Sequence, residues 1–162
     1  MIKKYELTNE TKNCGIYTLH RIRAFKNFGA VKVGDLGGWI ESEHNLSQSG
    51  DCWIYDNATV CDNATVFGDA TVFGDARVCG DAIVCRNTDY IVVQGFGRVQ
   101  RVTTFYRLKD GDIGASCGCF HGTIKQFRDK VKETHGDNKY AKEYLMIADL
   151  MELHFGGGNH GE

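Results

Sequence analysis

Proline is absent from this 162-residue sequence, whereas glycine occurs 20 times. Turns must therefore be formed by glycine, asparagine and aspartate, which tolerate unusual backbone angles. The sequence also lacks an apolar run of 18 residues, and its first ten residues, MIKKYELTNE, contain no apolar segment of the signal-peptide kind. From these absences we expect a cytoplasmic protein with no membrane span and no membrane partner.

Several motifs of known chemistry are missing as well. The sequence has no G-x-S-x-G, no P-loop and no G-x-G-x-x-G. Its net charge is −2, and residues 48–89 carry seven aspartates against two arginines, while the segments on either side carry only small positive charges. This distribution excludes the basic surface of a general nucleic-acid-binding protein.

The seven cysteines are an odd number, and without a secretory signal they do not indicate a disulfide framework. Cys117, Cys119 and His121 would share one face of a strand and so form a metal-binding alternative. A zinc site needs four ligands, however, and the sequence holds no second cluster. We therefore expect no metal and interpret most cysteines as small buried hydrophobic residues.

The dominant pattern is a hexad, seen most clearly in GDATVFGDARVCGDAIV at residues 68–84. An aliphatic residue recurs every six positions, at Ile54, Val60, Val66, Val72, Val78 and Val84. Two positions earlier stands a small residue, at Cys52, Ala58, Ala64, Ala70, Ala76 and Ala82, and turn-forming pairs separate the hexads. Three hexads make one triangular coil of a parallel β-helix with the aliphatic side chains inside. Antiparallel hairpins are the alternative, but they rarely keep so strict a phase.

The position after each aliphatic residue is also apolar and would face outward. These positions hold Tyr55, Cys61, Phe67, Phe73, Cys79 and Cys85, and residues 18 apart would stack on one another. Monomers rarely expose such patches. We expect either the C-terminal segment or other copies of the chain to cover them, and a homotrimer is the preferred arrangement.

The flanks predict further elements. Residues 15–40 alternate as strands, and Trp39-Ile40 is expected to plug the N-terminal end of the repeat. Strands joined by the KDGD turn follow the repeat, and a helix begins at the capping box of Thr123 and Gln126, before a second helix. The predicted divisions are N-terminal strands at 1–47, the repeat at 48–95, a strand-plus-two-helix module at 96–155 and a disordered tail at 156–162.

The segment GDLGGWIESEHNLSQSGDCWIYDNATV, followed by GDA hexads, resembles hexapeptide-repeat proteins that bacterial and phage genomes encode and that are catalogued in part as transferases. The closing GCFHGTIKQFRDKVKETHGDNKYAKEY resembles a C-terminal module of phage-type members. The resemblance implies a mainly β fold with a short left-handed parallel β-helix, and the cytoplasm of a host cell if a phage encodes the protein.

Two functions are consistent with these features. The preferred prediction is a non-catalytic binding protein without a cofactor, which sequesters a host nucleotide signal or blocks a host defence protein. Arginine and aromatic side chains would hold a phosphorylated aromatic ligand if the two flanks converge. The predicted ligand-binding residues are Arg21, Arg23, Lys26, Trp39, Arg98, Arg101, Phe105, Tyr106 and Arg107.

The alternative function is acyl transfer. The resemblance implies that such an enzyme is a trimer that binds acetyl-CoA or another acyl-thioester between neighbouring subunits and uses a histidine as general base. None of the six histidines lies inside the repeat. His44 and His121 are the first candidates for that base.

Overall fold

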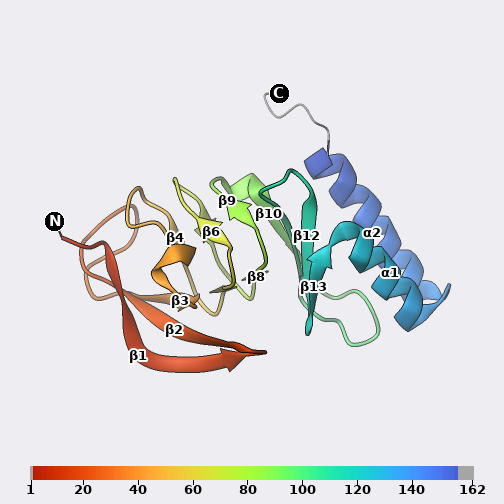
Figure 1. Ribbon diagram of the computed structural model, residues 1–162, viewed down its shortest axis with the longest axis horizontal. Helices are drawn as coiled ribbons and strands as arrows, with labels where there is room; N and C mark the ends of the chain where they lie inside the picture. Colours follow the sequence, from red (N-terminus) through yellow and green to blue (C-terminus); the bar gives the residue numbers. More distant parts are fainter. Residues whose placement is uncertain (1, 157–162) are drawn as a thin grey trace.

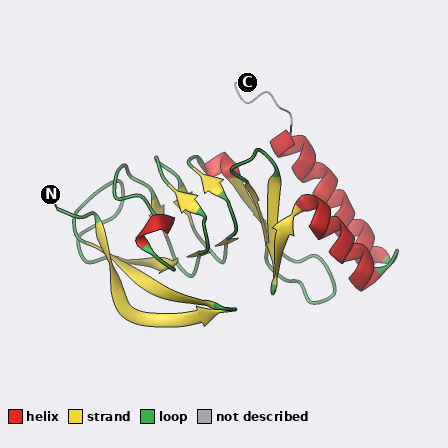
Figure 2. Cartoon of the chain, viewed as in Figure 1, coloured by secondary structure: helices red, strands yellow, loops and turns green. Residues whose placement is uncertain are grey.

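The computed structural model describes residues 2–156, so the tail that the sequence predicts to be disordered lies, from residue 157 onward, outside the described residues. An N-terminal hairpin lies along a stack of short strands, and a four-stranded sheet with two helices follows at the other end (Figures 1 and 2). The protein is therefore mainly β with a C-terminal strand-plus-two-helix module. No helix of these residues is both long and apolar enough to cross a membrane.

The N-terminal hairpin consists of β1 (Tyr5–Cys14) and β2 (Tyr17–Ala24), and β3 (Leu36–Ile40) pairs antiparallel with β2. Strand β3 lies directly against the repeat. A Cβ on Gly37 would approach the carbonyl oxygen of Ile54 to 2.6 Å, so only glycine allows the two backbones to pack this closely.

The repeat forms six two-residue strands, which pair in parallel with one another two by two. They are β4 (Trp53–Ile54), β5 (Thr59–Val60), β6 (Thr65–Val66), β7 (Thr71–Val72), β8 (Arg77–Val78) and β9 (Ile83–Val84). The strand pairs β4–β7, β5–β8 and β6–β9 each join residues that are 18 apart. Because all three ladders are parallel, the hairpin alternative is wrong.

Parallel pairing begins before the hexads that the sequence displays. Ile40 pairs with Val60 through β3, and Leu46 forms a bridge to Val66 after the short 3-10 helix η1 (Glu43–Asn45). Each of these pairs joins residues that are 20 positions apart, whereas the later pairs join residues 18 apart. This first coil is therefore two residues longer than the next.

The aliphatic and small residues of the hexads fill one core, as predicted. Ile54 and all five valines are fully buried, and the small residues before them are at most 1% exposed. Each turn between hexads opens with a residue of positive φ, namely Asp56, Asp62, Gly68, Gly74 and Gly80, with φ between 54° and 70°. Aspartate and glycine recur here because they accept this left-handed backbone region better than other residues.

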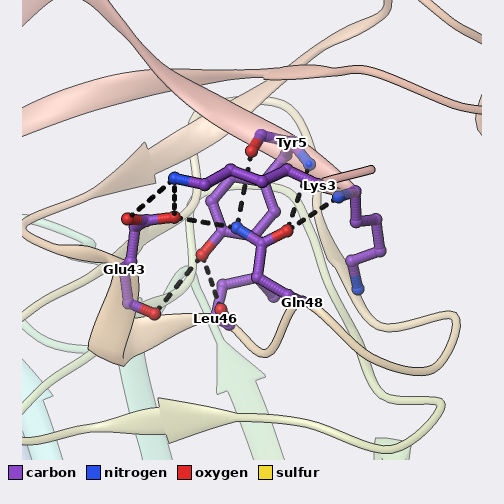
Figure 3. Close-up of polar contacts among 6 residues, drawn as sticks. Lys3, Tyr5, Glu43, Leu46 and Gln48 are labelled. Carbon is purple, nitrogen blue, oxygen red and sulfur yellow. Dashed lines mark hydrogen bonds and ion pairs between the residues drawn. The ribbon is translucent and has the colours of Figure 1, made fainter. Parts of the chain in front are cut away.

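Polar contacts fasten the start of the chain to the first coil (Figure 3). The Tyr5 hydroxyl donates to the Leu46 carbonyl at 2.5 Å, while the Gln48 amide donates to Glu43 at 2.9 Å. The Lys3 ammonium forms an ion pair with the same Glu43 carboxylate at 3.1 Å. The N-terminal end of the core is thereby closed by the Tyr5 ring and by Trp53, which is 1% exposed.

The C-terminal module is an antiparallel sheet covered on one face by two helices. Its strands are β10 (Tyr90–Val93), β11 (Thr103–Arg107), β12 (Ile113–Cys117) and β13 (Phe120–Thr123), and its helices are α1 (Ile124–His135) and α2 (Lys139–Gly156). The predicted capping box is confirmed, because the Gln126 N–H donates to Thr123 Oγ1 and the Thr123 N–H donates to Gln126 Oε1. The other face of the sheet lies on the last coil, where the Lys109 N–H donates to the Asp81 carbonyl.

A buried carboxylate joins the repeat to this module. Asp89 lies in the 3-10 helix η2 (Asn87–Asp89), is 2% exposed, and accepts hydrogen bonds from the N–H groups of Cys85 and Arg86 and from Arg107 Nε on β11, each at 3.0 Å. Burial by itself raises the pKa of this carboxyl, but the hydrogen bonds from Cys85, Arg86 and Arg107 together lower it below its ordinary value.

The substitution Asp89→Asn is expected to destabilise the protein by about 2 kcal/mol at pH 7, because the buried donors lose a charged acceptor. A carboxyl with a lowered pKa stabilises the fold above the pKa of the unfolded chain, which is 3.8, and this contribution disappears as the pH falls further. Urea unfolding of both proteins should therefore show a difference that narrows below about pH 4. The exposed Asp69→Asn is the matched control, and an unchanged difference at low pH would contradict the assignment.

Candidate functional site

Both histidines proposed as bases lie along one corner of the stacked coils. His44 Nε2 is 3.2 Å from the carbonyl oxygen of Asn63, and the Asn63 side-chain amide donates to Asp81 Oδ1 at 3.2 Å. Asp81 and His121 line the same recess at the end of this row. We call these four residues the corner column: His44, Asn63, Asp81 and His121.

The sequence did not single out Asn63 and Asp81, which occupy ordinary turn positions. Their spacing of 18 residues, one coil, is the signal that places one above the other. His44 enters the column because it lies on η1, whose Asn45 side chain donates to the carbonyl oxygens of Asp62 and Ala64 in the same turn. Hydrogen bonds of His44, Asn45 and Asn63 therefore hold η1 and the turns of the next two coils together at this corner.

His121 borders a recess of about 130 Å³ between the last coil and the C-terminal sheet. Its walls include Asp81 and Cys79 from the repeat and Tyr106 and Gln126 from the module. His121 is exposed on β13, opposite Ser116, whose hydroxyl lies 2.8 Å from the Tyr106 hydroxyl. An imidazole beside a recess that opens to solvent is available to take a proton from a small polar group bound there.

Cys79, on the wall of this recess, is one of two buried thiols that contact each other. Cys61 Sγ and Cys79 Sγ, on adjacent coils, are 3.2 Å apart. The hydrogen bond from Cys61, together with Ser116 and the positive charge of Arg77, lowers the pKa of the Cys79 thiol to about 6 against the effect of burial. The same contact raises the pKa of Cys61, so the pair releases one proton readily and holds the second.

The expectation that Trp39 plugs the end of the repeat is wrong. Its ring packs with Leu19 on the outside of the coil and covers Cys61 and Cys79. The reason is the alternation of β3, which turns Ile40 into the core and Trp39 to the outer face. One of the three predicted apolar outer columns is therefore covered by the chain's own N-terminal hairpin.

The shared strand face expected for Cys117, Cys119 and His121 is also wrong. Gly118 has a φ of 61°, and a tight turn there separates β12 from β13 and pairs Cys117 with Phe120. His121 borders the recess, whereas both cysteines line a different cavity on the side of the helices. Within residues 2–156, no three His, Cys, Asp or Glu side chains gather as metal ligands.

The predicted ligand-binding residues of the N-terminal flank lie on the hairpin and β3. Arg21 Nε donates to the Gly37 carbonyl, and its guanidinium lies 5.5 Å from the Trp39 ring centre. Arg23 forms an ion pair with Glu6, and Lys26 is exposed. Of these residues the structure brings Arg21 and Trp39 into contact.

The predicted residues of the C-terminal flank are divided between three environments. Arg98 and Arg101 line the cavity on the helix side of the sheet, and Arg107 is paired with Asp89. The rings of Phe105 and Tyr106 are at most 1% exposed, so they offer no face for stacking on a ligand. Within residues 2–156, none of the three cavities of about 340, 470 and 130 Å³ is lined by both the N-terminal and the C-terminal group, and the binding role of these residues stays a prediction.

No protein-family model matches the chain. Over 42 residues the chain is 45% identical to a protein of Escherichia coli (strain K12) named "Uncharacterized acetyltransferase YdcK". The match covers 26% of this chain and 13% of that relative, so the chain spans only a small part of its length.

This similarity corrects the preferred functional prediction. A non-catalytic binding protein that sequesters a host signal or blocks a host protein is the wrong choice, because the relative carries the name of an acetyltransferase. The acyltransferase alternative is favoured instead. Residue types alone misled here because the base candidates lie outside the repeat, and only the fold brings them to one corner.

The cover over the thiol pair can be tested by Trp39→Ala. Removing this ring, which is 7% exposed, should cost about 3 kcal/mol of stability and open Cys61 and Cys79 to an alkylating reagent. Mass spectrometry after brief labelling should find these two cysteines modified in the variant but protected in the parent, where the exposed Cys119 reacts first. The exposed Phe25→Ala is the control, and protection that survives loss of Trp39 would refute this role for the ring.

Proposed function

We propose that this protein is an acyltransferase of the hexapeptide-repeat class and transfers an acyl group from an acyl-thioester such as acetyl-CoA. The observation that carries the proposal is the corner column, in which both candidate histidines lie against one edge of the coils and His121 borders a recess. The similarity to a protein named as an acetyltransferase supports it independently.

The reaction needs few groups. The imidazole of His121 accepts the proton of an acceptor hydroxyl or amine while the acceptor's lone pair attacks the thioester carbonyl carbon. The tetrahedral intermediate collapses with cleavage of the carbon–sulfur bond, and the leaving thiolate takes the proton from the imidazolium. Asp81 lies on the wall of the same recess and offers a polar side chain to the acceptor.

The proposal includes a left-handed coil and a homotrimer. In support of self-association, Phe67 and Phe73 remain 40% and 53% exposed on the two faces that the hairpin does not cover. The corner column lies between β5 and β6, so it borders the face that carries Phe67. A second copy seated on that face would close the corner column and provide the second wall for an acyl-thioester.

The catalytic test is release of free coenzyme from acetyl-CoA in the presence of a panel of amines and hydroxylated acceptors. Release should be followed by chromatography, because the exposed Cys119 would react with a thiol dye. His121→Asn should lower kcat by about 100-fold or more, with a smaller effect on KM, as expected for loss of a general base. His44→Asn should reduce the rate less, because His44 lies outside the recess.

The matched control is His20→Asn on β2, whose ring contacts the Thr8 carbonyl away from the corner column. This variant should retain the parent rate. Failure of the parent to release coenzyme with any acceptor, or equal rates for the parent and His121→Asn, would overturn the proposal.

Self-association can be tested separately. Phe67→Glu and Phe73→Glu should shift the protein from trimer to monomer in native mass spectrometry, because they place a charge in the apolar contact. The control Leu153→Glu changes an exposed residue of α2 and should leave the trimer intact. A monomeric parent protein would rule out the trimer.

A further inference from the structure

A second cavity of about 340 Å³ lies on the helix side of the C-terminal sheet. Its floor is apolar and includes Phe120 of β13, Phe127 and Val131 of α1, and the ring of Tyr144 of α2. The loop between β10 and β11, residues 94–102, forms its outer wall. It shares no lining residue with the recess of His121, so the two sites are separate.

The outer wall is held in place by α2. The Tyr144 hydroxyl donates to the Phe96 carbonyl at 3.2 Å, and the Gly97 N–H donates to Glu143 Oε1 at 3.4 Å. A Cβ on Gly97 would come within 2.2 Å of the Tyr144 oxygen, so the loop reaches α2 only because residue 97 is glycine. The cavity is thus a built feature of the module.

Positive charge surrounds this apolar floor. Arg98 and Arg101 from the loop and Lys130 from α1 all line the cavity. Arg101 lies over Gly118, where an added Cβ would be 2.8 Å from Nη1. Within residues 2–156, neither Arg98 nor Arg101 forms an ion pair with a carboxylate. Five other arginines do, namely Arg21, Arg23, Arg86, Arg107 and Arg128.

The polar groups that line the cavity include the Tyr144 hydroxyl, which donates to the Phe96 carbonyl. Burial raises the pKa of the Tyr144 hydroxyl to about 12, so it keeps its proton at neutral pH. The Cys117 thiol lies beside it, and the charge of Arg101 acts on the Tyr144 hydroxyl. No carboxylate is among the residues that line the cavity, and the nearby Glu143 carboxylate accepts the Gly97 N–H.

We propose that this cavity binds a small carboxylic acid with an apolar body, whose carboxylate pairs with Arg101 and Arg98 and whose body lies on Phe120, Phe127 and Val131. A guanidinium presents two parallel donors that match the two oxygens of a carboxylate. A water molecule takes up about 30 Å³ in the liquid, so this cavity of about 340 Å³ has room for a ligand of roughly ten non-hydrogen atoms. Medium-chain fatty acids and arylpropionic acids have this size and chemistry.

The test is calorimetric titration of the full chain with octanoate and 3-phenylpropionate, each compared with its uncharged amide. The acids should bind below about 1 mM, which is within the range expected for ligands of this size. The amides should bind at least 10-fold more weakly. Arg101→Gln should weaken acid binding by about 10-fold or more, and Arg101→Lys should restore part of it.

Lys125→Gln is the matched control, because Lys125 lies on α1 but outside the cavity and is paired with Asp129. It should bind the acids as the parent does, and thermal unfolding should confirm that each variant is folded. Equal affinity for acid and amide, an unchanged affinity in Arg101→Gln, or no binding of either acid would overturn the proposal. None of these outcomes bears on coenzyme release, which concerns the recess of His121.

Discussion

The fold depends on the stacking of aliphatic side chains in a core that excludes water. A two-residue strand has too few hydrogen bonds to persist alone, and each of the six is stable because its inward residue packs on the equivalent residue 18 positions away. The corners matter equally, since the positive φ of Asp56, Asp62 and the three glycines after them turns the chain without lengthening the coil. An extra residue at a corner would turn a valine outward.

The ends of the stack determine what surrounds it. At the N-terminal end, Tyr5 and Trp53 close the core, and the hairpin that carries Tyr5 continues along the coil to cover the thiol pair. At the other end, Tyr90 and Tyr106 complete the core from the C-terminal module. The module therefore closes the coil with one face of its sheet, while the opposite face and its helices form a core of their own.

The sequence predicted the repeat, its inward residues and the capped helix, because these follow from local periodicity and short-range hydrogen bonds. It did not predict that Trp39 would cover the thiols, since the alternation of β3 allows either face to be the inner one. The Gly118 turn was missed because C-G-C-F-H also suits a continuous strand. The corner column was missed for another reason: His44, Asn63, Asp81 and His121 are far apart in the chain, and only the length of the coil and the docking of the module bring them together.

The acidity of the repeat bears on where an acyl-thioester with phosphate groups would be bound. Most of its aspartates lie at the turns, and of its two arginines Arg86 pairs with Asp89 while Arg77 donates to the Gly118 carbonyl. At physiological salt such charges act over about 8 Å, so the corners themselves disfavour phosphate. Positive groups for it must then come from the flanks, whose net charge is positive, or from those of a second copy. If the proposed acyl transfer takes place at the recess of His121, the coil supplies the recess while the flanks supply the counter-charge.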